Sequence, residues 1–192
     1  KNFEKVISIF RNILGKNVTI ETNTNGDKLS AAKIDSLFKA GLNNLYWNLY
    51  DGPHQLEPAI NLVEISKYRD NIRLRPHWPG SNLEYEAGVI LNNRSGMLNT
   101  DSFKQSEKLL PLARSCNYPF YKMFVDWNGD VLFCSNDWGR EHVVGNLMNQ
   151  SLHEVWFGKP MEKIRRRLME GDRSHSPCNK CSVDGSLFGK PS

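Results

Sequence analysis

Four cysteines constrain this 192-residue chain more than any other feature of its sequence. Seventeen residues separate Cys116 from Cys134, forty-three separate Cys134 from Cys178, and two separate Cys178 from Cys181. The Cys-x-x-Cys pair can supply two thiolates from one tight turn. Four thiolates from three chain segments suit either a tetrahedral Zn²⁺ or a [4Fe–4S] cluster. The spacing therefore predicts one metal centre and leaves the choice of metal open.

Such cysteines could instead form disulfides or a redox-active dithiol. No stretch approaches the roughly 20 apolar residues that cross a bilayer, and the N-terminus lacks a signal pattern, so we expect a cytoplasmic protein without a membrane partner. Cytosolic thiols are kept reduced, which disfavours disulfides. A redox Cys-x-x-Cys usually begins a helix that lowers the thiol pKa, whereas Pro177 precedes this one and a Gly/Ser-containing tail follows.

The charge balance gives no sign of a nucleic-acid partner. The chain has 25 Lys and Arg against 21 Asp and Glu, a formal net charge of +4. The densest basic run, Arg165 to Arg167, lies among apolar residues at helical spacing and is typical of a solvated helix face. Because no nucleic-acid-binding motif accompanies this run, we expect no nucleic acid to bind.

The first half of the chain alternates helix and strand. Apolar spacing predicts helices over residues 3–14 and 30–41 and a third with Ile60, Val63 and Lys67 along one side; strands are expected at 18–22, 45–50 and 71–75. Successive helix-then-strand units predict a parallel sheet in an α/β fold, with functional loops at the carboxyl ends of the strands. Three strands are too few for a closed eight-stranded barrel, so the sheet is open or part of something larger.

The second half predicts a small α+β module. Two short β segments, 122–126 and 131–134, flank the turn-forming pair Asn128-Gly129 and indicate a hairpin. Ser151 to Glu154 form a capping box, and Pro160 opens a helix that ends near Gly171. We expect a small core around the metal to contain three tryptophans, Trp127, Trp138 and Trp156.

The motifs around the cysteines resemble the SPASM/twitch domain at the C-terminus of radical S-adenosylmethionine (SAM) enzymes. The resemblance covers roughly residues 93–181 and rests on Cys116-x-x-Pro119-Phe120, Val125-Asp126-Trp127-Asn128-Gly129-Asp130-Val131 leading to Cys134, Gly145-Asn146, Ser151-Leu152-His153-Glu154-Val155-Trp156, and Gly171 before Cys178-x-x-Cys181. It implies that all four cysteines bind an auxiliary [4Fe–4S] cluster. A full SPASM domain has more cysteines and binds two clusters. The four cysteines of this chain therefore resemble the shorter twitch domain, which binds one cluster. The alternative is that the four cysteines bind zinc, which would stabilise a non-catalytic interaction module.

The first half is similar to the middle of the radical SAM partial (β/α) barrel. The resemblance implies a barrel fragment over residues 1–92 and an auxiliary cluster domain over residues 93–192. It also implies that Asn48 faces SAM, whereas Asn25 would either contact SAM or close a turn. The guanidinium of Arg94, in an Asn-Arg-Ser-Gly segment, would bind a hydroxyl or carboxylate of substrate or form a structural salt bridge. The Cys-x3-Cys-x2-Cys loop that holds the SAM cluster in this family is absent. We therefore expect this polypeptide alone to be inactive, with SAM and a second [4Fe–4S] cluster bound only by an intact parent enzyme.

The function implied by this resemblance is that of a dehydrogenase-type oxidoreductase. Its auxiliary cluster would accept an electron from a radical on a small polar substrate, such as a sugar, cyclitol or peptide. An electron-donor protein such as flavodoxin or ferredoxin is the implied protein partner.

Overall fold

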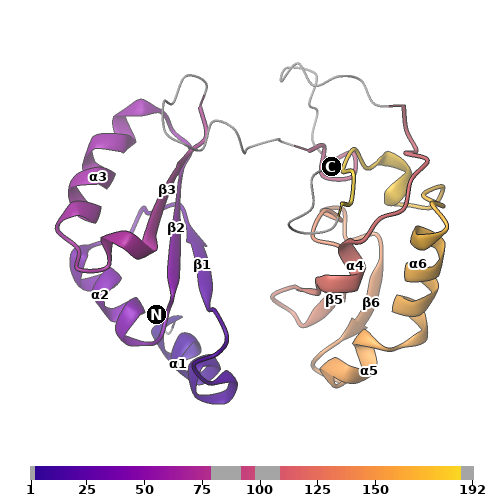
Figure 1. Ribbon diagram of the computed structural model, residues 1–192, viewed down its shortest axis with the longest axis horizontal. Coiled ribbons are helices and arrows are strands. Elements are labelled where there is room, and N and C mark those ends of the chain that lie inside the picture. Colours follow the sequence, from indigo (N-terminus) through magenta and orange to yellow (C-terminus); the bar gives the residue numbers. More distant parts are fainter. Residues whose placement is uncertain (1–2, 79–91, 98–108, 187–192) are drawn as a thin grey trace. The chain divides into compact units, whose positions relative to one another are not determined.

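The computed structural model describes residues 3–78, 92–97 and 109–186, which divide into two compact units, residues 1–90 and 91–192. Each unit combines helices with one three-stranded sheet, which confirms the predicted mixed α/β character (Figure 1). The elements are α1 (Phe3–Leu14), β1 (Glu21–Thr24), α2 (Ala31–Lys39), β2 (Asn44–Leu49), α3 (Leu56–Glu64), β3 (Ile72–Pro76), α4 (Tyr118–Tyr121), β4 (Phe124–Val125), β5 (Asp130–Leu132), β6 (Val143–Asn146), α5 (Leu152–Trp156) and α6 (Lys159–Met169), with short 3₁₀ turns at Pro53–Gln55, Arg69–Asn71 and Cys178–Lys180.

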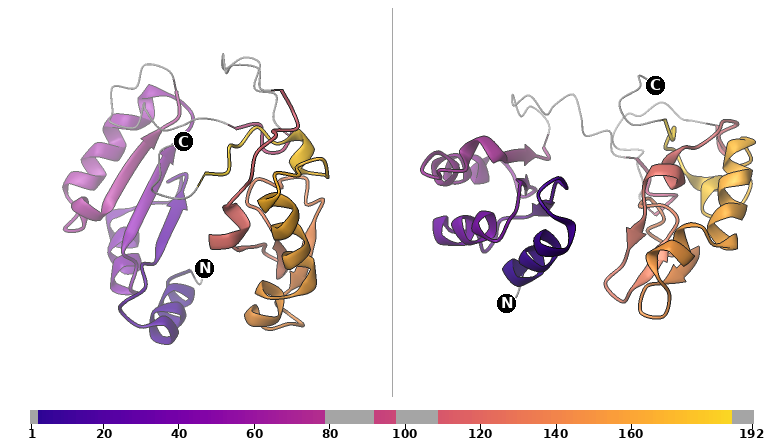
Figure 2. Two further views of the ribbon diagram at one scale, coloured as in Figure 1. Left: turned by 45° about the vertical axis from the view of Figure 1, so that its right-hand side comes forward. Right: turned by 60° about the horizontal axis from the view of Figure 1, so that its bottom comes forward.

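The first unit is built on a parallel sheet of order β1-β2-β3. Helices α2 and α3 cover one face of this sheet (Figures 1 and 2). The main core cluster contains Ile7, Ile34, Leu37, Phe38, Leu42, Leu45 and Ile72. Ser30 caps α2 as predicted, because its side chain accepts a hydrogen bond from the backbone N–H of Lys33.

Helix α1 forms where the apolar spacing predicts it, but only Ile7 on it is buried. The other apolar side chains of its expected core face are partly exposed, Ile13 by 74%. The first strand also begins later than expected, at Glu21. The guanidinium of Arg11 explains this shift, because it binds the carbonyl oxygens of Gly15 and Val18 and holds the intervening residues as a loop.

The third helix is shorter than its predicted apolar side. It ends at Glu64, so Lys67 lies beyond it and is not part of its buried face. The Lys67 ammonium instead lies 3.2 Å from a carboxylate oxygen of Asp35, in the middle of α2. A charged side chain is more stable in this exposed ion pair than in a core.

The second unit is built on an antiparallel sheet of order β4-β5-β6. The backbone N–H of Gly129 donates to Asp126 across the turn between β4 and β5. Strand β6 contains the Gly145-Asn146 motif, which the sequence did not identify as a strand. Helix α6 contacts α4, α5 and β6, and the core consists of Val131, Phe133, Val144, Val155, Met161, Ile164, Leu168 and Cys178.

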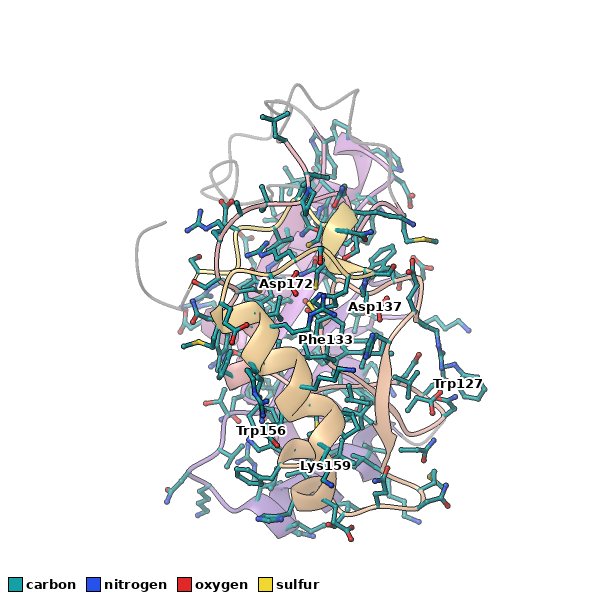
Figure 3. All side chains as sticks on the ribbon, turned by 90° about the vertical axis from the view of Figure 1, so that its right-hand side faces the viewer. Trp127, Phe133, Asp137, Trp156, Lys159 and Asp172 are labelled. Carbon is teal, nitrogen blue, oxygen red and sulfur yellow. The ribbon has the colours of Figure 1, made fainter. Side chains whose placement is uncertain are left out.

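The capping box of α5 is confirmed, since Ser151 and Glu154 each bind the other's backbone N–H. The predicted tryptophan core is wrong for two of its three members. Trp127 is 89% exposed at the hairpin turn, well away from Phe133 in Figure 3, and Trp138 is 54% exposed. Trp156 is half-buried beside the guanidinium of Arg165 and is not part of the core cluster. A side chain at the tip of a hairpin has little around it to pack against, so Phe133 and aliphatic residues form the core instead. No helix in the described ranges has the length and apolar character needed to cross a membrane.

Candidate metal centre

The four cysteines line one cavity of the second unit. Cys116 precedes α4, Cys134 follows β5, and Cys178 and Cys181 flank the 3₁₀ turn after α6. None of them forms a disulfide; Cys178 and Cys181 are buried and the other two are half-buried. The structure therefore brings together the three chain segments whose convergence the spacing predicts.

Backbone hydrogen bonds fix the segments that carry the thiols. The N–H of Cys116 donates to the carbonyl oxygen of Leu168 in the last turn of α6, at 3.1 Å. The N–H of Cys181 donates to Cys178 at 3.1 Å and closes the tight turn between them. The backbone N–H of Asn136 lies 3.4 Å from the sulfur of Cys134 and its side-chain amide lies 3.7 Å away. Sulfur that accepts such bonds is stabilised as thiolate.

Burial sets the protonation of these thiols when no metal is bound. It raises the pKa of Cys116 and of Cys178 above the ordinary value, and it raises the pKa of Cys134 to about 11. The bond from Asn136 to Cys134 and the charge of Arg173 near Cys116 act in the opposite direction. The thiols of Cys116, Cys134 and Cys178 are thus protonated at neutral pH, and binding a metal to them must release protons.

The donor set of the cavity fits a soft metal centre. Besides the thiols it is lined by Tyr118, Pro119, Phe133 and Val183, with Ser95, Asn136 and Arg173 as its polar members. Sulfur-only sites select zinc or iron–sulfur clusters over magnesium, calcium or manganese. None of the described residues that line the cavity carries a carboxylate or imidazole that could compete for the metal.

The same thiols do not form a preassembled single-ion site. Within residues 3–78, 92–97 and 109–186, no three histidine, cysteine, aspartate or glutamate side chains are grouped as ligands of one metal ion. A metal centre bound in the cavity would therefore need the four sulfurs to adjust around it.

Arg94 lies beside this cavity. Its guanidinium donates to the side-chain oxygen of Asn136 at 3.3 Å and lies 4.9 Å from the centre of the Trp138 ring. Its Nε is buried, and no described residue accepts a hydrogen bond from it. One donor of Arg94 is thus left for another group.

The two residues predicted to face SAM lie in the first unit. Asn48, near the end of β2, is buried, and its side-chain oxygen lies 3.1 Å from Nε2 of His77. Asn25 follows β1, where its side-chain amide donates to Asp27 and its carbonyl accepts the indole N–H of Trp47. Both residues lie at the carboxyl edge of the parallel sheet, the edge at which such sheets bind ligands.

Sequence reasoning missed the three polar residues that line the metal cavity besides the cysteines, Ser95, Asn136 and Arg173. Ser95 has a left-handed backbone, with φ of 55°, and is buried against the cavity. Arg173 is also buried, and its partners are backbone carbonyl oxygens. Any residue type offers such oxygens, so no sequence pattern announces these contacts.

Comparisons with known proteins agree with this centre. Residues 116–182 match the family model of the SPASM iron–sulfur cluster-binding domain. The chain is also 25% identical over 164 residues to the S-adenosyl-L-methionine-dependent 2-deoxy-scyllo-inosamine dehydrogenase of Niallia circulans. That alignment covers 83% of this chain and 60% of the dehydrogenase, so the chain spans about three fifths of this curated relative.

Solved structures show the fold that the chain shares. A crystal structure of BtrN in complex with AdoMet and 2-DOIA matches with a TM-score of 0.75 at 21% identity, covering 96% of this chain and 68% of that one. BtrN in an open conformation matches with a TM-score of 0.66 at 18% identity, covering 95% and 65% of the two chains. Residues 116–182 thus resemble the SPASM iron–sulfur cluster-binding domain, and the chain shares the fold of BtrN.

Proposed function

We propose that Cys116, Cys134, Cys178 and Cys181 hold one auxiliary [4Fe–4S] cluster of a radical SAM oxidoreductase. The observation that carries this proposal is the cavity that all four thiols line, within the segment that matches the SPASM domain. When bound, such a cluster supplies a one-electron acceptor. Four protein thiolates would leave no iron open to substrate, which favours electron transfer over substrate binding.

The chain's own residues would prepare this centre in three ways. The four thiols would provide the ligands after losing their protons. Asn136 would donate hydrogen bonds to the sulfur of Cys134, which favours its ionised form. The apolar side chains of Phe133 and Val183 would limit the access of water to the sulfurs.

We extend the proposal to substrate and SAM. Arg94 would use its free Nε–H to bind a hydroxyl or carboxylate of a small polar substrate. An aminocyclitol is one candidate class, because the Niallia circulans relative is named for 2-deoxy-scyllo-inosamine. Asn25 and Asn48 would face SAM in the first unit, as part of a (β/α) barrel over residues 1–92, and flavodoxin or ferredoxin would exchange electrons with the intact protein.

A redox titration of the anaerobically reconstituted chain tests the electron-acceptor role. We expect a brown protein whose visible absorbance bleaches reversibly with about one electron per chain from dithionite. Cys134→Ser should lower bound iron and the bleachable absorbance at least several-fold. Ser135→Ala, which changes the neighbouring residue and leaves the thiol set intact, should keep both.

The opposite outcome is equally clear. A chain that stays colourless after reconstitution, binds zinc through the same four thiols and takes up no electron would be a zinc-stapled module, and the proposed function would be wrong.

A further inference from the structure

Arg173 is the one charged side chain among the described residues that line the cysteine cavity. It follows α6, it is 2% exposed, and it lines the same cavity as the four thiols. Its guanidinium donates hydrogen bonds of 2.6 to 2.9 Å to four backbone carbonyl oxygens, those of Arg114, Ser115, Val183 and Asp184.

These four bonds engage every nitrogen of the Arg173 guanidinium but do not neutralise its charge. Among the residues that the structure describes, no carboxylate forms an ion pair with this guanidinium. A buried charge without a counter-charge is strongly unfavourable in a protein interior. The four thiols are the groups on the cavity wall that can become anionic when they bind a metal.

A cluster in this cavity would provide the missing counter-charge. Four thiolates around a [4Fe–4S] core leave a net negative charge, and one-electron reduction makes that charge larger by one. A fixed positive charge nearby therefore stabilises the reduced form more than the oxidised form. Net charge and hydrogen bonding around a cluster are among the main determinants of its reduction potential.

We propose that Arg173 is a positioning residue that compensates the charge of the auxiliary cluster and raises its reduction potential. This inference rests on the proposed function, because it needs a cluster in the cavity. It adds that the guanidinium makes the site a better electron acceptor than four thiolates alone would make it.

The hydrogen bonds of Arg173 give it a second effect. They join the segment just before Cys116 to the segment just after Cys181. These two cysteines are far apart in the sequence. Arg173 thus holds both ends of the cysteine set in place before any metal binds, which lowers the ordering cost of binding.

Midpoint potentials of reconstituted variants of the full chain separate the charge of Arg173 from its scaffold role. Arg173→Gln removes the charge and should make reduction at least about tenfold less favourable, a shift of ~59 mV to lower potential for one electron. Arg173→Lys keeps the charge with fewer donors and should stay closer to the wild-type potential. Arg165→Gln is the matched control: Arg165 also binds two carbonyl oxygens, those of Pro119 and Trp156, but does not line the cavity, so its loss should leave the potential unchanged.

Each outcome decides the inference. If Arg173→Gln holds no cluster while Arg173→Lys holds a full one, the charge is required and the inference stands. It is overturned if Arg173→Gln keeps the wild-type potential. It is also overturned if folded Arg173→Gln and Arg173→Lys lose the cluster equally, because the role is then that of a scaffold. A wild-type chain that takes up no iron and sulfide would instead refute the proposed function itself.

Discussion

Gly185 lies so close to Cys116 that a side chain would occupy the space of the thiol. Its backbone is left-handed, with φ of +74°, and an added Cβ would be 2.4 Å from the sulfur of Cys116 and 2.9 Å from Nη2 of Arg173. Real Cβ atoms essentially never approach other atoms so closely, so one of the two groups would have to move. The carbonyl oxygen of Gly185 also accepts the backbone N–H of Asn117, which limits how far the glycine can retreat.

We predict that Gly185→Ala lowers bound iron in the reconstituted chain to less than half of the wild-type amount. Displacing the sulfur of Cys116 removes one of four ligands, and displacing Arg173 weakens the bonds that hold the segments next to Cys116 and Cys181. Iron and sulfide per chain measure the effect. Gly171→Ala is the matched control, because Gly171 has φ of +78° but an added Cβ would meet only ordinary contacts, the nearest at 3.6 Å. Both variants share the backbone cost of about 1 to 2 kcal/mol, so equal iron loss in both would contradict the steric explanation.

At this scale the sequence predicts ligands better than it predicts their surroundings. The cysteines could be grouped because thiols are rare and their spacing matches a known ligand pattern. Gly185 and Arg173 could not be found, since one acts through the absence of a side chain and the other through backbone carbonyl oxygens.

Between elements, a polar cluster joins α1 to α2. The carboxylate of Glu4 accepts hydrogen bonds from the ammonium of Lys33 and from the hydroxyl of Ser36, the latter at 2.9 Å. The bond from Lys33 is the largest cause that lowers the pKa of Glu4 from 4.5 to about 2. Few apolar residues of α1 are buried, so these polar bonds contribute to keeping the helix in place.

We predict that Glu4→Gln destabilises the first unit at neutral pH and that the difference from wild type disappears in acid. The folded state holds Glu4 ionised more strongly than the unfolded state does. The stabilising contribution is therefore present above pH 4.5 and is lost as the pH falls towards 2. Thermal or urea unfolding at several pH values measures it. Glu64→Gln, which removes an exposed carboxylate at the end of α3, should show no such pH-dependent difference, and a constant Glu4→Gln effect down to pH 2 would contradict the assignment.

The sequence predicted helix starts correctly where the signal lies in neighbouring residues. The N-cap of α2 and the capping box of α5 depend on neighbouring residues and were found at the correct positions. Strand β6 was missed because its four residues become a strand by pairing with β5, and Trp127 was wrongly expected in the core because burial depends on distant neighbours.

For the whole molecule, the inventory of cysteines limits the chemistry that this chain can perform alone. The chain has four cysteines, all between residues 116 and 181, and all four line one cavity. We predict that the reconstituted and reduced chain cleaves no SAM, because no thiol is left to hold a second cluster. Chromatographic detection of 5′-deoxyadenosine measures this, and the S-adenosyl-L-methionine-dependent dehydrogenase of Niallia circulans is assayed in parallel. Enzyme-dependent formation of 5′-deoxyadenosine by this chain would contradict the prediction.

The metal content of the chain purified without oxygen shows directly whether the four cysteines hold a [4Fe–4S] cluster. We expect a brown protein with about four iron and four sulfide per chain, reduced several-fold in Cys134→Ser and unchanged in Ser135→Ala. A colourless protein that carries one zinc, and that takes up no iron and sulfide when zinc is removed under the same conditions, would contradict it.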